Sequence, residues 1–258
     1  MASNTTFIEV KDRGWLNGFE PLWRKENQSW WGTWSWLVKI LIWTVIIDGM
    51  LAIVAFEDEQ SALMIYFIFA AIVPACALII FGHETILDER KMGTAAWVLS
   101  KPVSRAAFLL AKLSANALGV LVTMVLVPGL VAYFICKAAS GIWLSIPGFL
   151  AGLGLVYLFL IFYQALVLML STLFYSRGPV IAIPLVIISC SYLAILVPGL
   201  GNILPSSLIL SLGMDQPSLA EALAQSAPLQ TVMPILATVL LVILFIIVAI
   251  LRFEREEF

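Results

Sequence analysis

Long apolar runs alternate with short polar segments over most of the chain. Six of these runs reach the roughly 20 residues that an α-helix needs to cross the hydrocarbon core of a bilayer. They extend approximately over residues 34–56, 61–82, 106–135, 148–174, 179–199 and 231–251. The third and fourth runs are long enough to tilt or to project beyond the lipid. The pattern predicts an all-α membrane protein with six transmembrane helices.

The segment before the first run has the pattern of an amphipathic helix. Apolar residues recur at helical spacing at Trp15, Phe19, Leu22 and Trp23. Polar residues take the opposite face, so we expect a helix in the cytoplasmic interface that starts or restarts at Glu20-Pro21. Four tryptophans follow at positions 30, 31, 34 and 36. They predict an aromatic belt where the chain enters the membrane, with an aromatic substrate cage as the alternative.

Composition supports a single integral membrane domain. Of the 258 residues, 62% are hydrophobic and 12% are charged, whereas soluble proteins carry about 25% charged residues. We expect a cytoplasmic or interfacial segment over 1–33, a membrane domain over 34–251 and a cytoplasmic tail over 252–258. The start of the chain has no basic region followed directly by an apolar run, so we expect no cleavable signal peptide.

The basic residues fix the expected orientation. All but one of the 14 Lys and Arg residues fall on one side of the predicted spans, and the exception is Lys137. Basic residues concentrate on the cytoplasmic side of membrane proteins, so both termini are expected in the cytoplasm. On the other side, Glu57-Asp58-Glu59 forms a short turn that is either solvated or able to gather cations. Residues 200–230, apolar but broken by Pro205 and Pro217, predict a short re-entrant or interfacial hairpin.

Three polar residues inside the predicted spans are candidates for a substrate path or gate. Asp48 lies deep in the first span, where a bare carboxylate is costly. Lys39 lies nine positions earlier, near the opposite helix face, and is expected to snorkel to the membrane boundary. The alternative is that Asp48 reaches water at the outer end of the helix. Asn116 and Gln164 are weaker candidates, for which hydrogen bonding between helices is the alternative.

Motifs for enzyme chemistry are missing from the sequence. It has one histidine, no GxxxxGK[ST] phosphate loop, no GxSxG elbow and no HExxH helix. Its three cysteines are far apart in apolar surroundings and suggest core residues rather than metal ligands. We therefore expect no catalytic residue, no metal site and no cofactor bound by this chain.

The one sustained polar interruption, residues 83–105, connects the second and third runs. The second helix is predicted to continue to about Arg90, and Gly93 permits a change of direction. Thr94 is a candidate N-cap for a short helix that contains Trp97 and Leu99 and ends before Pro102. Ser104 is expected to cap the third span. The result is a short helix laid crosswise at the membrane surface; the alternative is an interfacial loop with Trp97 dipping into lipid.

This segment resembles the signature of ABC-2 type transporter permeases. The family pattern is an acidic residue, a Gly-Thr pair, a Leu-Ser/Thr-x-Pro-Val/Ile-Ser-Arg segment and a later lysine. Here it corresponds to Glu84, Gly93-Thr94, Leu99–Arg105 and Lys112. The triplet Arg24-Lys25-Glu26 resembles the N-terminal helix of the same family. Among subgroups, the sequence is most similar to the small permeases of copper-enzyme maturation systems.

The resemblance implies the membrane subunit of an ABC exporter in a prokaryotic cytoplasmic membrane. Two such subunits, identical or homologous, would pair, and two separate ATPase subunits carrying ATP and Mg²⁺ would dock below; no nucleic acid is expected. The resemblance assigns coupling to Glu84, Glu89, Arg90, Gly93, Thr94, Trp97, Leu99, Pro102 and Arg105. Trp97, Leu99 and Arg105 would contact the ATPase, while Glu84, Glu89 and Arg90 would brace the segment. The alternative function is a non-catalytic subunit or scaffold of a larger membrane enzyme assembly.

Overall fold

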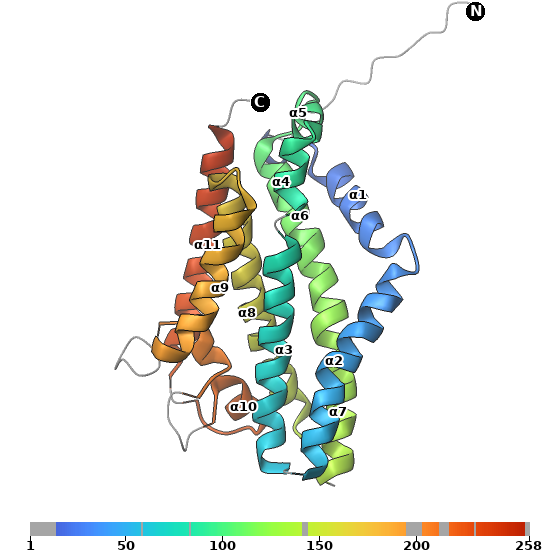
Figure 1. Ribbon diagram of the computed structural model, residues 1–258, viewed down its shortest axis with the longest axis vertical. Helices are drawn as coiled ribbons and strands as arrows, with labels where there is room; N and C mark the ends of the chain where they lie inside the picture. The colour runs from blue at the N-terminus through green and yellow to red at the C-terminus, as the bar shows by residue number, and fades with distance from the viewer. Residues whose placement is uncertain are drawn as a thin grey trace, which may run out of the picture.

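A computed structural model describes residues 14–57, 59–82, 84–140, 144–194, 203–211, 217–229 and 231–255. Every regular element within these ranges is a helix. The long helices run side by side along the longest axis of the molecule (Figure 1). The all-α prediction is confirmed for the described residues.

Among the described residues, five apolar helical stretches are long enough to cross a membrane. They are α2 (Ser35–Glu57), α3 (Glu59–Gly82), the continuous stretch from α6 (Arg105–Val120) to α7 (Val127–Ser140), α8 (Ile146–Leu173) and α11 (Met233–Glu254). The fifth predicted span corresponds to α9 (Arg177–Ala194), which is apolar but shorter. Five of the six predicted spans therefore reach membrane length, and the predicted end of the fifth lies outside the described residues.

The third span contains a π-helical segment, η2 (Leu121–Leu126), between α6 and α7. Pro128 lies two residues after its end, and proline has no N–H to donate to the carbonyl of Met124, four residues earlier. Within the preceding turn, the Thr123 hydroxyl donates to the carbonyl oxygen of Gly119 at 2.8 Å. The span thus has a local irregularity of the kind that often accompanies functional sites.

Helix α8 forms the centre of the bundle and is buried along most of its length. It packs against α3 on one side and α11 on another. Near the N-terminal ends of α3 and α8, aromatic rings of Tyr66, Phe67, Tyr133 and Phe149 pack together, with centroids 5.3 to 6.1 Å apart. In contrast, α2 lies at the edge of the bundle (Figure 1) and exposes Leu41, Ile53 and Phe56, as expected for a helix that faces lipid.

The N-terminal segment is a 3₁₀ turn, η1 (Gly14–Leu16), followed by α1 (Phe19–Trp31). Gly18 separates them in the left-handed region, with φ of 80°. A β-carbon there would come within 2.7 Å of Val103, so the close approach as well as the φ angle requires glycine. The predicted restart is therefore confirmed, with Pro21 in the first turn of α1. This helix packs along α6.

The segment between α9 and α11 contains a short 3₁₀ helix, η3 (Pro205–Leu208), and α10 (Leu219–Ala224). Pro205 begins η3, and Pro217 precedes Ser218, which caps α10 by accepting from the Glu221 N–H at 3.2 Å. Helix α10 packs on α8 at one end of the bundle, while the beginning of α1 and the end of α11 lie toward the other end, with α5 (Figure 1).

Candidate functional site

The polar connection between the second and third spans forms two short helices, α4 (Glu84–Lys91) and α5 (Thr94–Leu99). Gly93 changes the chain direction between them with φ of 71°. The predicted short helix before Pro102 is thus confirmed. The predicted N-cap role of Thr94 is wrong, because Thr94 is the first residue of α5 itself and Gly93 precedes the helix. The Thr94 hydroxyl donates back to the Glu89 carbonyl at 3.2 Å. This bond ties α5 to the end of α4.

One aromatic residue of α5 points away from the bundle. The Trp97 side chain is 62% exposed, and the Lys101 ammonium lies 3.8 Å from the centroid of its ring. Met92, in the turn before α5, is also exposed. Leu99, by contrast, packs inward against an apolar cluster. Trp97 therefore offers a rigid aromatic surface at this end of the molecule.

Lys112 on α6 joins the connection to the N-terminal helix. Its side-chain nitrogen lies 2.9 Å from a carboxylate oxygen of Glu26 on α1 and 2.9 Å from one of Glu89 on α4. Lys112 is 4% exposed, and the two glutamate side chains keep about a fifth of their surface accessible, 20% and 21%. This ion triad holds three helices that are distant in sequence.

Arg90 ties α4 to the end of α8. It donates to the carbonyl oxygens of Ser171 and Thr172 at 2.6 and 3.4 Å, and its guanidinium stacks 4.7 Å from the centroid of Tyr175. Cations stabilise carbonyls at a helix C-terminus. Next to it, Asp88 pairs with Arg177 at 2.7 Å. Lys91 lies three residues on in the same helix, but the tertiary structure supplies Arg177 as the partner of Asp88.

Arg105 makes the corresponding contact with the last span. It donates to the carbonyl oxygens of Phe253 and Glu254 at 3.1 and 2.5 Å, at the end of α11. Beside it, the rings of Phe108 and Phe253 stack with centroids 5.6 Å apart. These rings belong to a cluster that also receives Leu99 and Val98 from α5. Arg105 and Leu99 are thus occupied by contacts within the chain.

Ser104 joins the connection to the N-terminal segment. Its hydroxyl caps α6 by accepting from the Ala107 N–H at 3.1 Å and donates to the Trp15 carbonyl oxygen. Its own N–H donates to the Asn17 carbonyl oxygen at 2.9 Å. The predicted cap is confirmed. Of the remaining residues, His83 and the side chain of Glu84 lie outside what the structure describes.

A cavity of about 400 Å³ lies between the ends of α1 and α2 and the middle of the bundle. Asn116 and Gln164, far apart in sequence, both line it. Two lysines, Lys39 and Lys112, line it as well, together with the indoles of Trp30 and Trp43. Its volume lies within the range of about 300–1,000 Å³ typical of small-molecule sites.

Trp30 shapes one wall of this cavity. Its indole N–H donates to the Asn116 side-chain oxygen at 2.8 Å, and its ring packs so closely on α6 that a β-carbon at Gly119 would come within 2.5 Å. The Lys39 ammonium lies 3.9 Å from the ring centroid. Trp30 therefore turns inward, whereas Trp34 is 81% exposed and suits the predicted aromatic belt.

Gln164 lies on the α8 side of the cavity. Its side-chain nitrogen donates to the Leu113 carbonyl oxygen at 3.1 Å. Its side-chain oxygen is buried and has no hydrogen-bond partner among the described residues. An unsatisfied buried acceptor is costly, so such groups often serve a function.

Asp48 does not line this cavity. It is 3% exposed on α2, and both carboxylate oxygens lack a hydrogen-bond partner among the described residues. Its electrostatic neighbours are Tyr66 of α3 and Cys136 of α7. Asp48 is therefore a separate buried carboxyl, away from Asn116 and Gln164.

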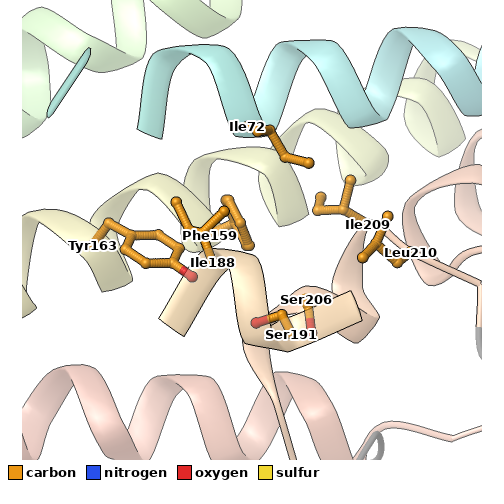
Figure 2. Close-up of a pocket in the computed structure, with 8 residues that line it drawn as sticks. All are labelled: Ile72, Phe159, Tyr163, Ile188, Ser191, Ser206, Ile209 and Leu210. Atoms are coloured by element: carbon orange, nitrogen blue, oxygen red, sulfur yellow. The ribbon is translucent and has the colours of Figure 1, made fainter. Parts of the chain in front are cut away.

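A much smaller gap, of about 10 Å³, lies between α3, α8, α9 and the segment around η3. Figure 2 shows its lining, in which the polar residues are Tyr163, Ser191 and Ser206. This volume suits about one water molecule, so the gap is too small for a transported molecule.

Glu221 on α10 is a buried carboxyl at the opposite end of the bundle from α5. It is 8% exposed and accepts from the Gln225 side chain at 3.3 Å. Burial raises the pKa of Glu221 above its ordinary value of 4.5, although its hydrogen bonds oppose the shift.

Sequence reasoning missed part of this arrangement. The sequence predicts Trp30 and Lys39 at the membrane boundary, and it singles out Glu26 only as part of the Arg24-Lys25-Glu26 triplet. The feature of the sequence that pointed to the triad was its resemblance to ABC-2 type permeases, because the matching residues include both this triplet and Lys112. Nothing in the sequence pairs Lys39 with Trp30.

Comparison with known proteins adds one finding. A family model described as ABC-2 family transporter protein matches residues 24–258. No curated protein matches the chain.

Proposed function

The chain belongs to the ABC-2 family of transporter proteins, and we propose that it is a permease that couples to separate ATPase subunits and exports its cargo. A multi-pass membrane protein follows from the family and from the long apolar helices. Proteins of this family generally work with ABC ATPases. A prokaryotic cytoplasmic membrane is the proposed location.

The observation that supports a role of α5 in coupling to the ATPase is how α5 is connected to the membrane helices. The exposed Trp97 lies on α5, between α4 and α6. Lys112 joins α4, α6 and α1, Arg90 joins α4 to α8, and Arg105 joins α6 to α11. A force on α5 can therefore pass to several spans through these ion pairs and hydrogen bonds. In this proposal Trp97 contacts the ATPase, while Leu99 and Arg105 position α5.

The ATPase is proposed as two copies of a separate chain, because this chain has no GxxxxGK[ST] phosphate loop. ATP and Mg²⁺ would be bound there. A second permease, either another copy or a homologue, would complete the assembly. The cargo route is proposed to include the cavity at Asn116 and Gln164, with Asp48 as a separate gating residue.

The proposal is tested by placing a charged side chain at the proposed ATPase contact, Trp97. Trp97→Asp should insert and fold normally but lose the co-purifying ATPase, because an aromatic anchor is replaced by a solvated charge. Trp97→Phe is the matched control, since it keeps an aromatic side chain at the same exposed position and should retain the ATPase. Unchanged ATPase recovery and activity with Trp97→Asp would refute coupling through α5.

A further inference from the structure

Within the part of the chain that the structure describes, the cavity between α2 and α6 is lined by basic side chains but by no acidic ones. Neither aspartate nor glutamate is among its lining residues, whereas Lys39 and Lys112 both are. Lys112 is already neutralised by Glu26 and Glu89. Lys39 has no carboxylate partner among the described residues, and its ammonium lies over the face of Trp30. One positive charge is thus left without an anion at the cavity.

A second donor lies in the same cavity. The Asn116 side-chain oxygen is occupied by the Trp30 indole, so the amide nitrogen is the group left to bond. No further hydrogen bond of Asn116 is found within the described part of the chain. An ammonium and an amide N–H both favour an oxygen anion, and hydrogen bonds from charged donors are the stronger kind.

The rest of the lining is apolar. Trp43, Leu78, Phe81, Val167 and Leu168 supply most of the remaining wall. These residues come from α2, α3 and α8, which are membrane helices. The cavity therefore combines a cationic group with a large apolar body, and the complementary ligand has one anionic head and an apolar tail.

We infer that this cavity binds an anionic amphiphile, with its acidic head at Lys39 and Asn116 and its apolar part against α3 and α8. The head of the ligand would lie beside the Trp30 indole, and its tail would be shielded from water. Calling this ligand the cargo rests on the proposed function, but the binding does not. The same chemistry fits a free fatty acid-like molecule and an anionic membrane lipid.

Binding is measured on the full chain in phosphatidylcholine nanodiscs with tritiated oleate, after subtracting empty discs. Methyl oleate has the same tail without the charge, and oleylamine reverses it. Oleate should bind saturably, and methyl oleate and oleylamine should bind at least about tenfold more weakly, as expected for loss of a charged hydrogen bond. Equal binding of oleate and methyl oleate would overturn the inference.

Two pairs of variants locate the site. Lys39→Gln should weaken oleate about tenfold and leave methyl oleate unchanged, whereas Lys25→Gln, at an exposed lysine of α1, should change neither. Leu78→Trp fills the cavity and should abolish binding, whereas Leu41→Trp, at a site 64% exposed on α2, should not. Should Leu78→Trp prove unstable, Lys39→Gln alone decides. Oleate binding unaffected by Lys39→Gln, or lost equally in Leu41→Trp, would overturn the inference.

Phosphatidylglycerol in the disc separates the two sources of ligand. Displacement of oleate by this lipid identifies a membrane lipid, and its failure to displace identifies a free amphiphile; either result supports the site. The ATPase recovery described above does not enter this assay. ATPase recovery left unchanged by Trp97→Asp, together with the expected oleate binding, would therefore refute the proposed coupling alone. Loss of the ATPase in Trp97→Asp without the expected oleate binding would refute only the cavity assignment.

Discussion

Removing Lys112 tests whether the ion triad stabilises the end of the bundle that carries α5. Lys112→Met keeps much of the length of the side chain but leaves Glu26 and Glu89 facing each other without a cation. Each lost contact measures 2.9 Å. We expect the protein to be destabilised, because two like charges then share a partly desolvated site.

The magnitude follows from burial. Breaking a fully buried ion pair costs about 3–5 kcal/mol. Lys112 is 4% exposed, but water reaches about a fifth of each glutamate side chain, 20% and 21%, and this screening lowers the cost. We therefore expect about 3 kcal/mol, near the lower end of that range. For a chain of this size this corresponds to a fall in melting temperature of about 6–12 °C.

The assay is thermal unfolding of the purified protein in nanodiscs, followed by the fraction that remains monodisperse. The triple variant Lys112→Met, Glu26→Gln, Glu89→Gln should recover most of the loss, since replacing a whole buried ion set with neutral groups is often nearly neutral. Lys25→Met is the control and should change stability by less than about 0.5 kcal/mol. A triple variant as unstable as the single one would show that Lys112 stabilises the fold through another contact, such as its cation–π contact with Phe108, rather than through its pairing with Glu26 and Glu89.

Three further predictions address orientation, the buried carboxyl in α2 and the outer segment. In a background without native cysteines, single cysteines at positions 58 and 215 should react with an impermeant reagent outside intact cells, and one at 101 should not; outside labelling of 101 would reverse the orientation. Asp48→Asn should alter transport or cargo-stimulated ATPase activity without loss of expression. Asp48→Leu should stabilise the fold by about 1–3 kcal/mol, because it removes an unsatisfied buried group. Transport at the parental level in both variants would show that Asp48 has only a structural role. The raised pKa of Glu221 means that the folded state favours its protonated form, so its contribution to stability is present below pH 4.5 and is lost as pH rises through the folded-state pKa. Glu221→Gln should therefore raise the melting temperature at alkaline pH, where the parent carboxyl is ionised, and flatten its decline as pH rises above 4.5; an unchanged pH profile would show that Glu221 does not titrate in this way.

The membrane helices could be predicted closely because their cause is local. An apolar run of about 20 residues must satisfy its backbone hydrogen bonds internally when it enters lipid, so length and hydropathy alone determine that it forms a helix. The predicted run 148–174 and the observed α8 (Ile146–Leu173) differ by only one or two residues at each end. The same local reasoning located α5, because glycine and proline bound it on either side.

Local reasoning was less successful for side-chain partners. Threonine is a residue type that commonly caps helices, yet the Thr94 hydroxyl donates to the Glu89 carbonyl oxygen because the chain folds back at Gly93. Asp88 has a lysine at helical spacing, but Arg177 from another connection approaches it more closely. The helix pattern specifies which residues share a face of one helix and gives no information on which other helix meets that face.

By itself, the sequence determined the class of the protein, the positions of its long helices and the segment that connects the second span to the third. The tertiary structure decided what these residues contact: it brought Glu26 and Glu89 to Lys112, turned Trp30 inward onto Gly119, and placed Asn116 and Gln164 at one cavity while leaving Asp48 outside it. The physical reason is the range of the interactions. Hydrogen bonds along a helix join residues four apart in the chain, whereas the triad and the cavity depend on how helices separated by tens of residues pack against one another.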